Sequence, residues 1–183
     1  LGAAFSYTFS TQSAQPALNL PLYQYSGAPV LFVPQYETEV PAQTINVSRV
    51  TFSRGRLDLA DFIKALQTYD GLSDWQSRVD STWVRLLNPA LNNVEIVNLP
   101  LTQERDKLLD PGLYFWQVDP GIAGEFPRQP TMLVVSPIQM LVKAADRQAF
   151  VWAISLNGDT PVADTLVTFY DETPSVLGSC VTD

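Results

Sequence analysis

The sequence predicts an all-β protein: an antiparallel β-sandwich of the immunoglobulin or fibronectin type III kind with one short inserted helix. Most of its apolar segments are short and alternate with polar residues, at the period of two that a half-buried strand requires. Glycine, proline and asparagine separate these segments, as expected for turns between antiparallel strands. Residues 59–66 instead carry apolar side chains at the spacing of a helix.

The first residues predict one strand with an aromatic face. Phe5, Tyr7 and Phe9 alternate with small polar residues, and a polar linker then runs to Pro16. Because a lone strand cannot bury its own face, this strand must pair with something else in the intact protein. The segment resembles the closing strand of an immunoglobulin-like module, and we assign residues 1–16 to the terminal strand of such a preceding module and its linker.

The central sandwich module is expected over residues 17–134, close to the ~100 residues of immunoglobulin-type sandwiches. The apolar parity between residues 44 and 52 changes at Arg49, which predicts a β-bulge. Residues 121–130 are rich in proline and glycine and predict a loop. Strands are predicted at residues 29–33, 44–52, 82–87, 93–99, 111–116 and 132–135.

The inserted helix is predicted from a single apolar stripe. Its members are Leu59, Phe62, Ile63 and Leu66. Asp58 is the predicted N-cap, and Asp61 lies in the first turn, where the helix dipole favours a negative charge. We expect this helix to cover one edge or end of the sandwich.

Residues 135–183 are assigned to the N-terminal part of a second module, because they provide about half of the length that a sandwich needs. The pattern from Met140 to Tyr170 predicts three antiparallel strands, with a tight turn at Asn157-Gly158. Residues 171–178 predict a further hairpin. Four bulky side chains of the middle strand share one parity and are expected to face the core: Phe150, Trp152, Ile154 and Leu156.

Two segments resemble the bacterial members of the alpha-2-macroglobulin family. The first runs from Gly158-Asp-Thr-Pro-Val-Ala to Tyr170-Asp171 and looks like the opening of a macroglobulin-like module. The second, Leu109-x-Pro-Gly-x-Tyr114, resembles a tyrosine-corner segment. The resemblance covers most of the chain from about Leu20. It implies macroglobulin-like sandwich modules, and a buried Tyr114 whose hydroxyl bonds to the backbone of the preceding connector.

Composition excludes the common catalytic devices. The 183 residues contain no histidine and a single cysteine, Cys180, so no Ser-His-Asp or Cys-His pair, internal disulfide or Cys-x-x-Cys metal site is available. The net charge is −8, so we expect no nucleic-acid partner. No apolar run is long enough to span a bilayer. The chain begins at Leu1, and we expect it to be a piece of a longer protein.

Cys180 is the first candidate for chemistry, because the resembled family can carry a thioester cysteine. That motif requires Cys-x-Glu-Gln, whereas Cys180 is followed by Val181 and Thr182. We therefore expect a half-buried strand cysteine, which behaves as a small hydrophobic residue.

Three pairs of carboxylates are candidates for acid–base or calcium chemistry. They are Asp58 with Asp61, Glu37 with Glu39, and Asp70 with Asp74. The segment from residue 70 to residue 74 lacks the Glu-terminated register of a calcium loop. Helix capping and solvated surface positions are the favoured interpretation of all three pairs.

The four tryptophans are candidates for a sugar-stacking platform. Trp83, Trp116 and Trp152 lie in apolar strands, which favours core positions, and Trp75 is expected in a loop and exposed. Asn46-Val-Ser48 matches a glycosylation acceptor, but we discount it because it lies in a predicted strand and the resembled proteins are bacterial.

The resemblance implies a non-catalytic structural module of a bacterial alpha-2-macroglobulin-type protease inhibitor, located in the periplasm or cell envelope. It has no predicted catalytic, cofactor or metal residue, and we expect no enzyme activity. Its expected partners are neighbouring modules of the same chain and, through the full-length protein, target proteases. Any membrane attachment is expected through an anchor outside this sequence. The alternative hypothesis is a cell-surface adhesin or carbohydrate-binding sandwich that binds a ligand through its loops.

Overall fold

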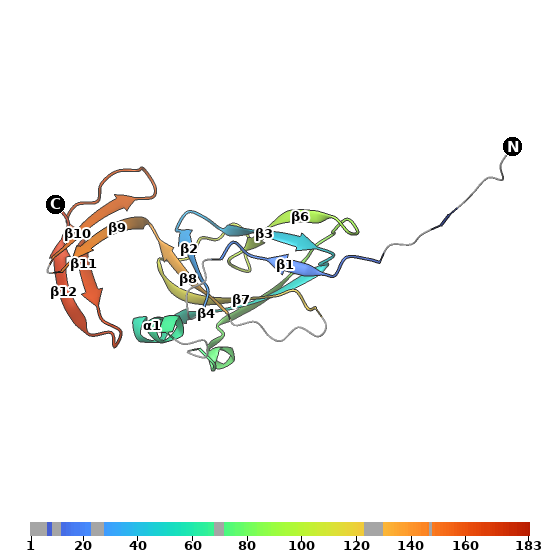
Figure 1. The fold of residues 1–183 in the computed structure, drawn as a ribbon, viewed down its shortest axis with the longest axis horizontal. Coiled ribbons are helices and arrows are strands. Elements are labelled where there is room, and N and C mark those ends of the chain that lie inside the picture. The colour runs from blue at the N-terminus through green and yellow to red at the C-terminus, as the bar shows by residue number, and fades with distance from the viewer. Residues whose placement is uncertain (1–6, 9–11, 23–27, 68–71, 123–129, 147) are drawn as a thin grey trace.

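The structure is a computed structural model that describes residues 7–8, 12–22, 28–67, 72–122, 130–146 and 148–183. A β-sandwich of two sheets occupies residues 17–136, and a layer with one α-helix and one 3₁₀ turn covers one of its faces. Two β-hairpins follow at the C-terminal side (Figure 1). The all-β sandwich with one short inserted helix is confirmed.

The smaller sheet of the sandwich has three antiparallel strands in the order β1-β3-β6. They are β1 (Ala17–Asn19), β3 (Glu39–Ile45) and β6 (Val94–Pro100). In β3, Val40, Ala42 and Thr44 are buried while the residues between them are exposed. This alternation is expected for a sheet with one face on the core and the other in solvent.

The larger sheet has five strands in the order β2-β8-β7-β4-β5. The pair β2–β8 is parallel and the other pairs are antiparallel. The strands are β2 (Val30–Pro34), β4 (Arg49–Leu57), β5 (Ser81–Leu86), β7 (Gly112–Asp119) and β8 (Thr131–Ser136).

The main core lies between the two sheets and is centred on stacked aromatic rings. The ring of Phe52 stacks on Trp83 at 5.2 Å and on Trp116 at 5.8 Å between centroids. The three rings come from β4, β5 and β7, and all three are buried. Such stacked pairs contribute about 0.5–1.5 kcal/mol beyond the area they bury, so they fix these strands against one another.

A second core lies on the outer face of the five-stranded sheet, under α1 (Leu59–Gln67) and η1 (Trp75–Arg78). Phe62 and Ala65 of α1 pack with Phe115 and Met132 of the sheet. Strand β7 is therefore buried on both faces, with Trp116 in the main core and Phe115 in the second. The helix covers a sheet face, whereas the sequence predicted an edge or an end.

Gly55 in β4 allows η1 to lie close to the sheet. A Cβ atom at this position would lie 2.2 Å from the carbonyl oxygen of Arg78 and 2.4 Å from the ring of Phe115. Since real Cβ atoms do not approach other atoms so closely, only glycine fits between the 3₁₀ turn and the strand.

The C-terminal region contains two antiparallel hairpins, β9–β10 and β11–β12. Their strands are β9 (Ile138–Ala145), β10 (Gln148–Ser155), β11 (Leu166–Tyr170) and β12 (Val176–Val181). The strand predicted at residues 165–170 thus pairs with the following strand. A single bridge between Ile154 and Pro161 connects β10 to the segment before β11.

The burial predicted for β10 is wrong for its two large aromatic side chains. Phe150 is 61% exposed and Trp152 is 48% exposed, whereas Ala153, on the opposite face, is 2% exposed. The alternation of bulky and small side chains identified the two faces of the strand correctly. It could not say which face packs against other residues.

The parity change at Arg49 has a different cause from the predicted bulge. Residues 46–48 connect β3 of the smaller sheet to β4 of the larger one, and Asn46 has a positive φ of 53°. The side chains change face because the chain changes sheet.

The module boundaries of the sequence analysis remain predictions. Strand β8 continues to Ser136, so the predicted boundary after residue 134 falls inside it. Most of the strand predicted at residues 5–9 lies outside the described residues, and Tyr7 and Thr8 belong to no strand. No helix in the described part of the chain has the length and hydrophobicity needed to cross a membrane.

Candidate functional site

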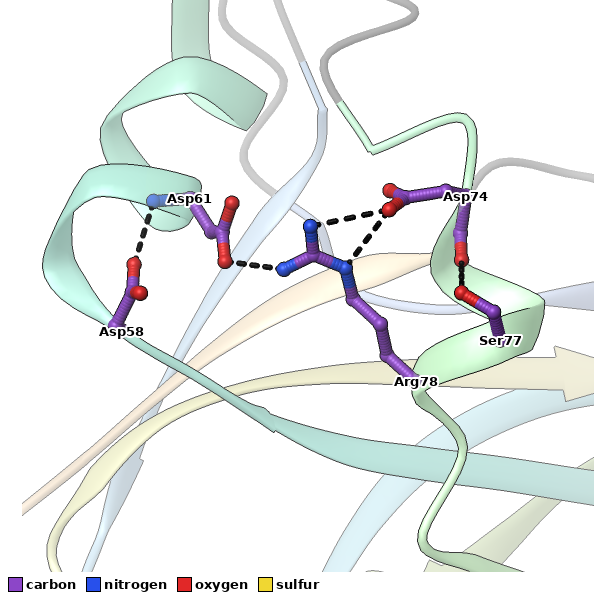
Figure 2. Close-up of polar contacts among 5 residues, drawn as sticks. All are labelled: Asp58, Asp61, Asp74, Ser77 and Arg78. Carbon is purple, nitrogen blue, oxygen red and sulfur yellow. Dashed lines mark hydrogen bonds and ion pairs between the residues drawn. The ribbon is translucent and has the colours of Figure 1, made fainter.

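Three of the acidic residues singled out in the sequence, Asp58, Asp61 and Asp74, meet at the junction of α1 and η1 (Figure 2). Asp58 caps α1, because its Oδ1 accepts a hydrogen bond of 2.8 Å from the backbone N–H of Asp61. The predicted N-cap is thus confirmed. The carboxylate of Asp61 pairs with the guanidinium of Arg78. We call Asp61, Asp74 and Arg78 the Arg78 clamp.

Arg78 binds both acidic members of the clamp. Its Nε lies 3.1 Å and its Nη2 lies 3.0 Å from Oδ2 of Asp74, and its Nη1 faces Asp61. The turn before it is tied by Ser77, whose hydroxyl donates to the carbonyl of Asp74 at 2.7 Å. Figure 2 shows the guanidinium between the two carboxylates. The hydrogen bond with Asp61, and then that with Asp74, raise the pKa of Arg78 above its ordinary value.

The Arg78 clamp holds secondary-structure elements together and offers no reactive group. Both carboxylates accept from a guanidinium that stays charged, so neither is free to act as a general base. The side chains of the clamp are 26–57% exposed, and each such ion pair contributes at most about 1 kcal/mol. The clamp therefore holds η1 beside α1. It also holds η1 over Gly55, where the absence of a side chain leaves room for the 3₁₀ turn.

The other carboxylate pairs are not brought together as acid–base pairs. Glu39 of β3 accepts from Arg105 Nε at 2.6 Å and lies 3.6 Å from Arg85, while Glu37 lies in the preceding turn. Asp70 lies outside the described residues. Within the described part of the chain, no three Asp, Glu or Cys side chains are grouped in a way that could hold a metal ion.

Cys180 and the tryptophans differ in part from expectation. Cys180 lies on β12 and is exposed, so the predicted half-buried position is wrong. Trp75 packs edge-on against Phe115 at 5.9 Å between ring centroids and is only partly exposed. The exposed tryptophan is Trp152 of β10.

Asn46 of the glycosylation motif is occupied by hydrogen bonds. Its Nδ2 donates to the carbonyl of Ala14 at 2.7 Å and to Asn92 Oδ1 at 3.1 Å, and its Oδ1 accepts from the N–H of Asn92 at 2.7 Å. The amide of Asn46 thus holds the linker before β1 against the β5–β6 turn.

An open groove of about 780 Å³ separates the helical layer of the sandwich from the C-terminal hairpins. On one side it is lined by Ile63, Leu66 and Gln67 of α1, and on the other by residues 170–173 at the end of β11. Gln67 Nε2 crosses it and donates to the carbonyl of Glu172 at 2.8 Å. We call this the joint groove.

The sequence analysis missed the Arg78 clamp and the joint groove. The spacing of four residues between Asp74 and Arg78 was a local signal for the first. Gln67 and Glu172 are 105 residues apart in the sequence, so no local pattern indicates their contact.

The arrangement of sandwich, helical layer and following hairpins is similar to solved structures of bacterial alpha-2-macroglobulins. The crystal structure of native alpha-2-macroglobulin from Escherichia coli spanning domains MG0-NIE-MG1 matches 98% of this chain, with a TM-score of 0.66 and 18% identity. The structure spanning NIE-MG1 matches 92% of this chain, with a TM-score of 0.67 and 20% identity. The chain has the fold of bacterial alpha-2-macroglobulin domains.

The alpha-2-macroglobulin likeness extends to a much longer chain. The cryo-EM structure of the native conformation of the E. coli protein matches 98% of this chain with a TM-score of 0.64 and 21% identity, but the match covers 12% of that chain. The matches cover 58% of the MG0-NIE-MG1 structure and 83% of the NIE-MG1 structure. No protein-family model and no curated protein matches the sequence. At sequence identities of 18–21%, the structural similarity establishes the fold alone.

Proposed function

We propose that this chain is a non-catalytic structural module of a bacterial alpha-2-macroglobulin-type protease inhibitor. The observation that carries the proposal is the match of 98% of the chain, sandwich and C-terminal hairpins together, to a single E. coli alpha-2-macroglobulin chain. A generic sandwich would match one module alone. Agreement across two modules and the joint between them favours a shared role in a longer chain.

In such an inhibitor, a protease cuts an exposed bait segment and the long chain rearranges to trap or tether the protease. This chain supplies scaffold, because its charged side chains near α1 are engaged in the Arg78 clamp and its Cys180 lacks the Cys-x-Glu-Gln context of a thioester. We propose a location in the periplasm or cell envelope. Partners are the neighbouring modules and, through the longer chain, the target proteases.

Protease-inhibition assays on the 183-residue chain and on the longer chain test this function. We expect the longer chain to protect a large protein substrate from digestion and the 183-residue chain to have no effect. The 183-residue chain should also catalyse no hydrolysis of peptide, ester or glycoside substrates. Inhibition by the 183-residue chain, or catalysis by it, would overturn the scaffold role, as would a longer chain that inhibits no protease class.

One observation favours a second candidate, a carbohydrate-binding or adhesin module. Phe150 and Trp152 are exposed on the same face of β10, and exposed aromatic rings offer flat apolar faces for stacking. A glycan array run with the native chain and with Trp152→Ala distinguishes the candidates. Specific glycan binding that Trp152→Ala abolishes would favour the adhesin. We expect no specific binding.

A further inference from the structure

Two connections between the sandwich and the second module can be identified in the described part of the chain. The first is Pro137, the single residue between β8 and β9. The second is the hydrogen bond that crosses the joint groove from Gln67 to Glu172. Open space of about 780 Å³ lies beside this bond. The described elements of the two parts otherwise make few contacts with one another, and such a junction leaves relative module motion as the default, unless something holds the two parts together.

The backbone on each side of Pro137 is fixed, and the Ser136 side chain bridges the two sides: its hydroxyl accepts from the N–H of Ile138 at 3.0 Å and donates to the carbonyl of Ile138 at 2.8 Å. On the sandwich side, the N–H of Gln35 donates to the carbonyl of Ser136 at 3.0 Å. On the other side, the N–H of Leu156 donates to the carbonyl of Pro137 at 2.9 Å. The change of direction between the modules is therefore confined to the residues about Pro137. Hinges have this form: a few residues at the ends of elements, between parts that are each rigid.

The turn that accepts the Gln67 hydrogen bond is rigid as well. Asp171 Oδ1 accepts from the N–H of Thr173 at 2.8 Å, from its hydroxyl at 2.9 Å, and from the N–H of Ser175 at 2.9 Å. Asp171 also donates its own N–H to the carbonyl of Ser175 at 2.9 Å. The carbonyl of Glu172 lies inside this turn, so it has a fixed position relative to β11 and β12.

We propose that Pro137 is a hinge and that the Gln67–Glu172 hydrogen bond is a latch that holds the sandwich and the second module in one relative orientation. In the latched orientation, apolar side chains face the groove from both walls: Ile63 and Leu66 from α1, and Tyr170 from β11. Loss of the latch leaves both modules folded, because α1 is held on the sandwich by Phe62 and Ala65, which point into the second core. This proposal uses contacts within the chain and does not depend on the proposed function.

Distance measurement between spin labels tests the latch. Cys180 is the only cysteine and is exposed on β12, so it takes one label without substitution. Gln43→Cys on the exposed face of β3 takes the second. We expect one narrow distribution of label-to-label distances in this doubly labelled protein, which is the background for the variants below. Gln67→Ala should add a second distance and raise the ratio of its population to the first about fivefold, the factor that corresponds to about 1 kcal/mol for one hydrogen bond.

Gln76→Ala is the matched control, since it removes the same side chain from the exposed surface of η1. It should leave the distribution of the background unchanged. A broad distribution already present in the background would overturn the latch. So would an unchanged distribution in Gln67→Ala, or equal broadening in Gln67→Ala and Gln76→Ala. The circular dichroism spectrum of each variant should match that of the background. A match would show that both modules remain folded, so that the effect is confined to the joint between them.

Discussion

Tyr114 ties the start of β7 to the connector before it. The side chain is 5% exposed, and its hydroxyl donates to the carbonyl of Asp110 at 2.9 Å. Its ring lies within 6 Å of the guanidinium groups of Arg54 and Arg56, at 5.9 and 5.8 Å from ring centroid to Cζ. The tyrosine corner that the resemblance implied is therefore confirmed in its geometry.

Tyr114→Phe should lower the free energy of unfolding by about 1 kcal/mol, the net value of one hydrogen bond. The ring contacts with Arg54 and Arg56 persist in the variant, so the change isolates the hydroxyl. Denaturant midpoints of the variant and the native chain measure the effect. Tyr36→Phe, on an exposed ring, is the control and should be neutral. Equal midpoints for Tyr114→Phe and the native chain would show that the hydroxyl of Tyr114 does not stabilise the fold.

A second prediction at the scale of residues concerns the pH dependence of the turn that the Asp171 carboxylate stabilises. The hydrogen bonds that its carboxylate accepts from the Ser175 backbone, and then from the Thr173 hydroxyl and backbone, lower its pKa from the ordinary value of 3.8. A lowered pKa in the folded state means that the turn is stabilised above pH 3.8 and loses this stabilisation as the pH falls through the folded-state pKa. Carboxyl chemical shifts followed by NMR should give a pKa below 3.8 for Asp171. Titration at 3.8 or above would contradict the turn geometry.

At the scale of elements, the strands and the helix were largely predictable and their partners were not. Local period placed a strand at 93–99 and a helix over 59–66, within a few residues of β6 and α1. The N-cap at Asp58 was predictable because capping is local.

Which face of an element is covered depends on residues far away in sequence, and local pattern does not contain that information. Phe150 and Trp152 on β10 have the alternation of a core strand, yet both are exposed. The helix stripe predicted Leu59, Phe62, Ile63 and Leu66 as its buried side. The structure buries Phe62 and Ala65 and leaves Ile63 on the wall of the joint groove.

The packing of η1 on β4 makes a prediction about Gly55. Gly55→Ala would place a Cβ against the Arg78 carbonyl and the Phe115 ring, and over-packing of this kind costs about 1–3 kcal/mol. Thermal or denaturant unfolding measures the loss. Gly178→Ala in β12 is the matched control, because a Cβ there has no atom within 4 Å. If both substitutions had the same small effect, η1 would not lie on the sheet as described.

At the scale of the whole molecule, two parts with different degrees of burial share one chain. The sandwich has two cores and buried central strands. The C-terminal hairpins expose many large apolar side chains, among them Met140, Leu141, Leu166 and Leu177. Cooperative stability should therefore be concentrated in β4, β7 and β8, whose amide groups are paired on both sides and lie near the two cores.

The scaffold role is tested most directly by amide hydrogen exchange on the longer chain, before and after it is cut by a target protease. A scaffold keeps its fold while other parts of the chain rearrange. We predict that peptides from β4, β7 and β8 show the same strong protection in the uncut and the cut chain, with changes confined to the joint and to regions outside the sandwich. Loss of protection in these three strands on cleavage, or a cleavage site within them, would contradict the scaffold role.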